Sequence, residues 1–256
     1  MLENEREAYE KFFKAFGLQL KFGLYQSYGM NKDLLQDLLL FYSVKQDKFV
    51  TLKEYLSLMS ENQKYIYYAS GKTIDSIKLS PQLDKVLSQG YDVICLTEDV
   101  DEFTLKCIQE YGEKQFRNVA GGDLGIEEEQ NNETYQELSS FIKEKLGDKV
   151  EKVRISNRIK NHAVCFTVEG EISLEMEKVL NSMPSSNNAI KAKKVLQLNS
   201  ESSICKAMNS LYENNADDEN LSKMINAVYN LACIIEGIQV DNPTEFADQV
   251  CELICK

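Results

Sequence analysis

The segment "KYIYYASGKTIDSIKLSPQLDKVLSQGYDVICLTEDVDEF", residues 64–103, decides the fold. It begins with an aromatic and β-branched run that is typical of a strand. Ser80 is a favoured N-cap and Pro81 a favoured first helical residue, so we expect a helix from there to Gly90. The continuous apolar run YDVICLT predicts a strand buried on both faces. Strand, helix and strand in this order predict a small sheet with parallel connections.

Gly71, Lys72 and Thr73 in the same segment are similar to the end of a phosphate-binding loop. Such a loop needs another glycine five residues before its Gly-Lys-Thr. That position is Ile66, and a β-branched residue resists the positive φ that glycine adopts without cost. The sequence therefore favours a glycine turn that leaves a strand, with Lys72 in solvent, over a nucleotide site.

Four carboxylates follow the second strand of this segment: Glu98, Asp99, Asp101 and Glu102. Ligands of open α/β sheets bind at the carboxyl ends of parallel strands, where clustered carboxylates can hold Mg²⁺ for phosphoryl transfer. Carboxylates are also what the first turn of a helix prefers, because they complement its partial positive charge. A Mg²⁺-dependent phosphoryl-transfer enzyme is therefore one alternative function.

Phe103 does not fit the helix predicted after these carboxylates. At about 100° per residue it points away from the face that Leu105, Ile108 and Tyr111 form. We expect it to be exposed or to pack on another element. An exposed aromatic side chain beside an acidic cluster is a candidate contact for another protein. A single exposed phenylalanine without a role is the alternative.

The N-terminal part of the chain is expected to form three helices. Aromatic residues at i, i+3, i+4 and i+7 give the first helix an apolar face, and Gly17 is expected to end it. The second is expected to begin after Asn31 and to run through Tyr42. Thr51 and Glu54 form a capping box that opens the third.

The stretch AGGDLGIEEEQNNE, residues 120–133, has no periodicity and predicts a hinge or linker. A second unit with helices and short strands follows it. The fold class is therefore α/β in the broad sense, a mixed α+β chain. We expect three domains: a three-helix segment at 1–60, a small αβα subdomain at 61–125 and a C-terminal domain at 126–256.

The helix predicted from Ser173 to Met183 has an apolar face. Methionines at i and i+7 suit an adaptable binding surface, as in promiscuous binders, and core packing is the alternative. Its candidate contact residues are Met176, Val179, Leu180 and Met183.

Two amphipathic helices close the chain and have little chain left to cover them. A symmetric partner would bury both apolar faces in an intermolecular four-helix bundle, and packing on their own domain is the alternative. The candidate interface residues are Leu221, Met224, Val228, Leu231, Ile235, Phe246, Val250, Leu253 and Ile254.

Composition excludes several classes of partner. The net charge of −12 and a pI near 4.8 argue against nucleic acid and against anionic membrane surfaces. The start MLENEREAYEK is charged, unlike a secretory signal, and no apolar run is long enough to span a membrane. The 7 cysteines form no C-x-x-C pair, and Cys251 and Cys255 lack a further ligand nearby for a metal. We expect a cytoplasmic protein without a metal.

Six segments, taken in order, resemble the middle and C-terminal regions of the heat shock protein 90 family of chaperones, most closely in its bacterial form. They are YEKFFKAFGLQLKFG, NKDLLQDLLLFYS, TLKEYLSLMSENQKYIYYASG, SPQLDKVLSQGYDVICLTEDVDEF, VRISNRI and YNLACIIEG. The resemblance covers nearly the whole chain, and its most specific part runs from ENQKYIYYASG to LTEDVDEF.

The resemblance implies that residues 1–125 belong to the middle domain of the family and that residues 126–256 are its dimerisation domain. Gly71 would then lie in a subdomain where the family binds no nucleotide. The family binds ATP and Mg²⁺ in an N-terminal domain that has no counterpart here, and the arginine that reaches the ATP phosphate precedes the matched region. The chain is therefore expected to hold no cofactor and to hydrolyse no ATP by itself.

The resemblance also implies homodimerisation through the last two helices and binding of unfolded or partly folded client proteins. The family's client surface includes the aromatic residue after an Asp-Glu pair, which corresponds to Phe103 beside Glu102. It also includes an amphipathic helix of the C-terminal domain, which corresponds to Met176, Val179, Leu180 and Met183. A dimeric scaffold without chaperone activity is a further alternative.

Several positions depart from the pattern of the family. An arginine is expected where Leu40 stands, a proline at Asp99 and at Ala163, and a His-Pro pair in the loop that contains Ser202. These changes affect loops and client preference and indicate a divergent member.

Overall fold

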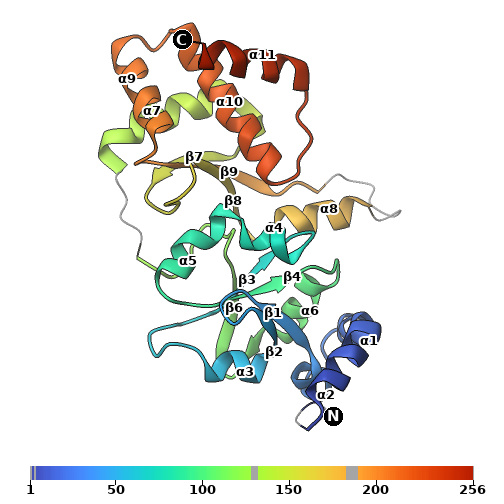
Figure 1. The fold of residues 1–256 in the computed structure, drawn as a ribbon. Helices are drawn as coiled ribbons and strands as arrows, with labels where there is room; N and C mark the ends of the chain where they lie inside the picture. The colour runs from blue at the N-terminus through green and yellow to red at the C-terminus, as the bar shows by residue number, and fades with distance from the viewer. Residues whose placement is uncertain (1, 3, 128–131, 183–189, 256) are drawn as a thin grey trace.

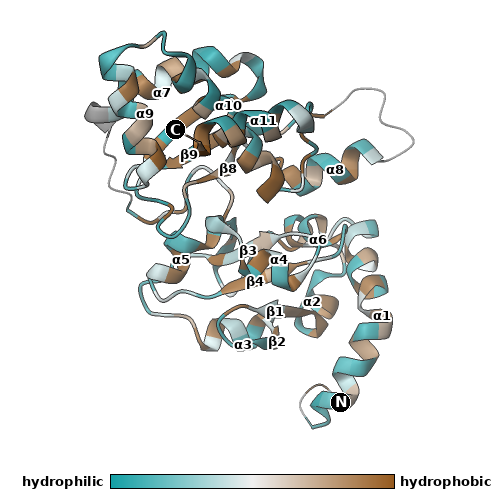
Figure 2. Cartoon of the chain, turned by 45° about the horizontal axis from the view of Figure 1, so that its top comes forward, coloured by the Kyte–Doolittle hydropathy of each residue, from teal (hydrophilic) through white to brown (hydrophobic). Residues whose placement is uncertain are grey.

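The computed structural model describes residues 2, 4–127, 132–182 and 190–255 and has the expected mixed α+β character (Figure 1). The chain forms two units, each with its own sheet. Hydrophobic and hydrophilic stretches alternate along the helices (Figure 2). No described helix is both long and apolar enough to cross a membrane.

The first unit is built on a six-stranded sheet with the strand order β2-β1-β4-β3-β6-β5. Its strands are β1 (Leu40–Ser43), β2 (Lys48–Thr51), β3 (Ile66–Ser70), β4 (Val93–Leu96), β5 (Glu110–Tyr111) and β6 (Lys114–Asn118). Its helices are α1 (Arg6–Gln26), α2 (Lys32–Leu35), α3 (Leu52–Ser57), α4 (Ile74–Lys78), α5 (Asp84–Ser88) and α6 (Asp101–Ile108), with 3-10 turns at Gln36–Leu38 and Pro81–Leu83.

The parallel pairing predicted for the opening segment is confirmed. β3 pairs in parallel with β4, with Tyr67 opposite Val93, and it also pairs in parallel with β6. Ser80 accepts a hydrogen bond from the backbone N–H of Gln82 and opens the turn that continues into α5. Gly90, at a φ of 74°, follows that helix. The aromatic and β-branched residues between the helical caps therefore predicted the strand pairing correctly.

Side chains of the central strands alternate between two separate cores. Ile66 and Tyr68 of β3 face α1, α3 and α6, whereas Tyr67 and Ala69 face α4 and α5. This alternation is the period of two that a pleated strand imposes. The sheet is therefore covered on both faces, as a parallel sheet requires.

The prediction of three helices at the N-terminus is wrong in two respects. α1 continues through Gly17 to Gln26, and the Cβ of an alanine at Gly17 would meet the Phe13 ring at 2.7 Å. The second helix, α2, ends at Leu35 and is followed by the 3-10 turn at Gln36–Leu38, and Leu40–Ser43 forms β1 instead. Pairing of β1 with β4 and β2 satisfies its backbone groups in the sheet, which outweighs the helical spacing of its leucines. The capping box of Thr51 and Glu54 is confirmed.

The second unit is built on a three-stranded sheet with the order β7-β9-β8, in which β9 is parallel to β7 and antiparallel to β8. Its strands are β7 (Lys152–Ser156), β8 (Val164–Glu169) and β9 (Lys193–Asn199). Its helices are α7 (Asn132–Leu146), α8 (Leu174–Ser182), α9 (Ser203–Asn214), α10 (Glu219–Ile235) and α11 (Pro243–Ile254), with a 3-10 turn at Gly147–Lys149. Residues of α7, α9 and α10 form the core above this sheet (Figure 1).

A buried arginine fastens the connection between the units. Arg158 is 2% exposed and donates hydrogen bonds to the carbonyl oxygens of Val119 at 2.8 Å, Gly121 at 2.6 Å and Gly122 at 3.2 Å. Gly121 also forms a parallel bridge with Val168 of β8. The start of the stretch predicted as a hinge is therefore held by backbone contacts, and residues 128–131 of that stretch lie outside the described part.

Candidate functional site

The turn around Gly71 follows the interpretation from the sequence. The N–H of Gly71 donates to the carbonyl oxygen of Leu96 at 3.1 Å, and Lys72 is exposed. Thr73 forms a capping box with Ser76 that opens α4. The backbone here makes a strand-to-helix turn and not a phosphate loop.

Asp101 is a structural carboxylate at the start of α6. It is 1% exposed and forms a 2.6 Å ion pair with Lys21 of α1. Its second oxygen accepts hydrogen bonds from the backbone N–H groups of Thr97 at 3.0 Å and Glu98 at 3.1 Å. This carboxylate therefore holds α1 and the β4–α6 loop against α6 and has little capacity left for a metal.

Glu102 faces the second unit. It is 5% exposed, and the Ser173 hydroxyl donates a 2.7 Å hydrogen bond to its Oε1. Burial raises the pKa of Glu102 above its ordinary value, and the hydrogen bond from Ser173 opposes that shift.

The acidic cluster is thus divided among separate partners. Asp101 pairs with Lys21, Glu102 contacts Ser173, and both Glu98 and Asp99 are exposed. In the part of the chain that the structure describes, no three His, Cys, Asp or Glu side chains are grouped as a metal site requires. The arrangement gives the phosphoryl-transfer alternative no support.

Phe103 packs on another element, which is one of the two outcomes expected for it from the sequence. Its ring meets the ring of Tyr25 edge to face, with centroids 5.5 Å apart, and is half-buried. Phe22 is 51% exposed and lies 6.2 Å from Tyr25, centroid to centroid. Aromatic rings of α1 therefore lead to Phe103 on α6, and no pattern in the sequence indicated the contribution of Tyr25.

The start of α8 lies against the start of α6. Ser173 accepts a hydrogen bond from the N–H of Met176 at 3.0 Å, so this hydroxyl caps α8 and contacts Glu102 at the same time. Met176 is 5% exposed, whereas Val179 and Leu180 are half-buried. Met183 lies outside the described residues.

A cleft of about 190 Å³ separates α8 from the β3–α4 and β4–α6 loops. Glu102, Met176 and Val179 all line it, together with Gly71 and Lys72. Phe103 and Leu180 are not among its lining residues. The fold thus gathers part of the predicted client set at one junction and leaves Phe103 beside it, against α1.

The residues predicted for the dimer interface fall into two groups. Leu221 and Val228 are fully buried in the core of their own unit, and Met224 packs against that core. Leu221 and Val228 therefore pack on their own unit, which is the alternative stated for these helices, and their part in a dimer interface stays a prediction. Leu231 at 38% and Ile235 at 44% are exposed.

The second group continues onto α11. Ile254 is 77% exposed, and no residue of α11 is buried. Phe246, Val250 and Leu253 are half-buried between α11 and its neighbours. Ile234, which is 52% exposed beside Ile235, extends the apolar surface and was missed. Its position next to a predicted interface residue, near the end of α10, is the sequence feature that could have identified it.

Comparison with known proteins places this fold in a family. The sequence model of the family described as "Hsp90 protein" matches residues 1–256. The chain therefore belongs to the Hsp90 protein family.

Three relatives show how similar the chain is to named members. It is 46% identical over 258 residues to the "Chaperone protein HtpG" of Clostridium perfringens (strain 13 / Type A). It is 48% identical over 260 residues to the protein of that name from Oceanobacillus iheyensis and 45% identical over 261 residues to that of Bacillus subtilis (strain 168). Each match covers 99% of this chain and 41% of the relative, so the chain spans about two fifths of their length.

Proposed function

We propose that this chain corresponds to the middle and C-terminal regions of an Hsp90 chaperone and acts by binding non-native client proteins as a homodimer. It acts in the cytoplasm, by binding alone, with no catalytic step or cofactor carried by its own residues. The names of the relatives support the chaperone role. The unpaired state of all 7 cysteines agrees with a reducing compartment.

The contact between Ser173 and Glu102 is the observation that most supports client binding. It brings the start of α8 against the start of α6, so the half-buried side chains of Phe103, Val179 and Leu180 lie on neighbouring helices of different units. A non-native segment that spans this junction would bury apolar surface from both units, at about 25 cal/mol per Å².

Suppression of aggregation tests the client surface. Phe103→Ala combined with Val179→Ser should weaken the ability of the chain to keep a thermally unfolded model client in solution. Leu58→Ser, a change of an apolar side chain that is 51% exposed at the end of α3 in the first unit, is the matched control. Equal suppression by all three proteins would favour a dimeric scaffold without chaperone activity.

The exposed apolar ends of α10 and α11 support the homodimer. Sedimentation should show a dimer for the wild type and a monomer for Leu231→Lys combined with Ile235→Lys, because two buried ammonium groups without partners are costly at an apolar interface. Leu58→Lys, at an apolar side chain that is 51% exposed at the end of α3, should leave the dimer intact. A dimer that survives the double substitution would mean that other residues form the interface.

A further inference from the structure

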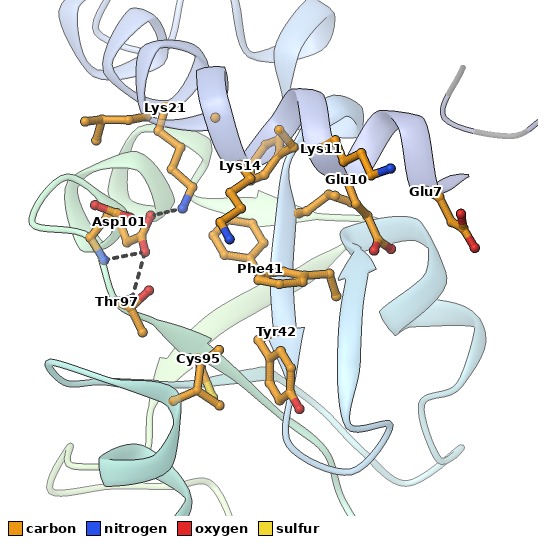
Figure 3. Close-up of a pocket in the computed structure, with 17 residues that line it drawn as sticks. Glu7, Glu10, Lys11, Lys14, Lys21, Phe41, Tyr42, Cys95, Thr97 and Asp101 are labelled. Carbon is orange, nitrogen blue, oxygen red and sulfur yellow. Dashed lines mark hydrogen bonds and ion pairs between the residues drawn. The ribbon is translucent and has the colours of Figure 1, made fainter. Parts of the chain in front are cut away.

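A second cleft, of about 580 Å³, lies between α1 and the edge of the first sheet (Figure 3). Its volume is within the range of small-molecule sites, roughly 300–1,000 Å³. Most of its floor is apolar. The apolar lining consists of Phe13, Gly17 and Leu18 of α1, Leu40, Phe41 and Tyr42 of β1, Phe49 of β2, Ile74 of α4 and Cys95 of β4.

The buried charges at one end of this cleft neutralise each other. Lys21 is 6% exposed, lies 2.6 Å from a carboxylate oxygen of Asp101, and stands over the rings of Phe13 and Phe41 at 5.6 and 5.2 Å from their centroids. Burial of this pair fixes the end wall of the cleft but leaves no net charge there.

Lys14, whose side chain is exposed, supplies a further positive charge at the rim of the cleft. It lies two turns before Lys21 on the same side of α1, and its ammonium group points into the cleft towards Phe41 (Figure 3). It forms no ion pair with any residue that the structure describes. Lys11, one turn earlier, extends along the helix and away from Phe41 (Figure 3).

Two of the other three carboxylates of the lining are engaged or lie at its far end. Glu10 pairs with Arg6 at 2.8 Å, and Glu7 lies at the far end of the cleft (Figure 3). Glu98 is exposed at the β4–α6 loop. A ligand that rests on the aromatic floor therefore meets the Lys14 ammonium, which points towards Phe41 (Figure 3).

We propose that this cleft binds a small amphipathic monoanion, an aryl or alkyl carboxylate. Its apolar body lies on the rings of Phe41 and Tyr42, and its carboxylate accepts a charge-assisted hydrogen bond from the Lys14 ammonium.

A charge reversal tests the site with 2-naphthoate and its cationic analogue 2-naphthylmethylammonium, both titrated calorimetrically into the full chain. The wild type should bind naphthoate saturably at one site and should prefer it to the cation. Lys14→Glu should weaken naphthoate binding by about tenfold or more and reverse the preference, because an attractive charge contact becomes repulsive.

Lys11→Glu is the matched control. Both lysines are exposed on α1 and both have a glutamate four residues earlier, so the two substitutions change helix charge alike. Lys11→Glu should leave the affinity for naphthoate within about twofold. Absence of saturable binding to the wild type, an unchanged affinity in Lys14→Glu, or an equal loss in Lys11→Glu would each overturn the proposal. Circular dichroism of both variants establishes that α1 remains folded.

Discussion

The hydroxyl of Ser173 donates a 2.7 Å hydrogen bond to Glu102 of the other unit and accepts one from the N–H of Met176 in its own helix. One side chain thus caps α8 and joins the two units. Local helix structure and the packing between units depend on each other at this point, which is also where the candidate client residues gather.

Ser173→Ala should lower the free energy of unfolding by about 2 kcal/mol, because α8 loses its cap and a buried carboxylate loses its donor. Urea denaturation measures the change. Ser140→Ala, at an exposed position of α7, is the control and should have little effect. If Ser173→Ala and Glu102→Gln destabilise additively in a double-mutant cycle, the two side chains are not coupled as described.

Glu236 should make stability depend on pH. Burial raises its pKa to about 7, Lys178 opposes the shift, and Glu175 adds to it. Its Oε1 accepts a 2.8 Å hydrogen bond from the Gln82 side chain of the first unit. A raised carboxyl pKa in the folded state means that the contribution to stability is complete below the ordinary pKa of 4.5 and is lost as the pH rises through about 7.

Glu236→Gln keeps the acceptor and removes the titration. The variant should therefore match the wild type near pH 4 and exceed its stability near pH 8 by about 2 to 3 kcal/mol. Denaturation curves of both proteins at the two pH values give the difference, from which the other titrating groups cancel. A difference that does not change with pH would contradict the assignment.

Two glycines of α1 should respond in opposite directions to alanine. The Cβ of Gly23→Ala would meet only a methyl group of Leu35, at 4.0 Å, so the helix should gain about 0.5–1 kcal/mol. At Gly17 the Cβ would lie 2.7 Å from the Phe13 ring, so Gly17→Ala should destabilise the chain by about 1–2 kcal/mol. Thermal denaturation separates the two, and equal shifts would show that Phe13 moves aside without cost.

Arg158→Met should loosen the connection between the units. Three carbonyl oxygens lose their donors, and we expect a loss of at least about 3 kcal/mol. Hydrogen exchange should rise first at residues 119–122. Arg154→Met provides the comparison, because Arg154 is less buried and reaches only the carbonyl oxygen of Gly122 among these groups. Equal exchange in the two variants would argue against a special role for Arg158.

The sequence predicted what local rules determine. The Ser80–Pro81 cap, the capping box of Thr51 and the parallel pairing of β3 and β4 each follow from residues close together in the chain. Gly17 misled because a glycine serves either as a helix stop or as space for a neighbouring ring, and the difference depends on the position of Phe13.

The candidate site was less predictable because it depends on contacts between distant segments. Periodicity marked Phe103 as unusual but did not reveal Tyr25, which lies far from it in the sequence. The burial of Glu102 results from the contact with the second unit. The burial of Leu221 results from the packing of α10 on its own sheet. Amphipathic spacing identifies an apolar face but does not say what covers it.

The hydrogen bonds that the Arg158 guanidinium donates to residues 119, 121 and 122 all end on backbone carbonyl oxygens. Every amino acid offers the same carbonyl oxygen, so the connection places no demand of its own on the identities of residues 119, 121 and 122. Over evolutionary time that segment is free to drift as far as its own turn geometry permits, whereas the arginine has no substitute with the same fork of donors.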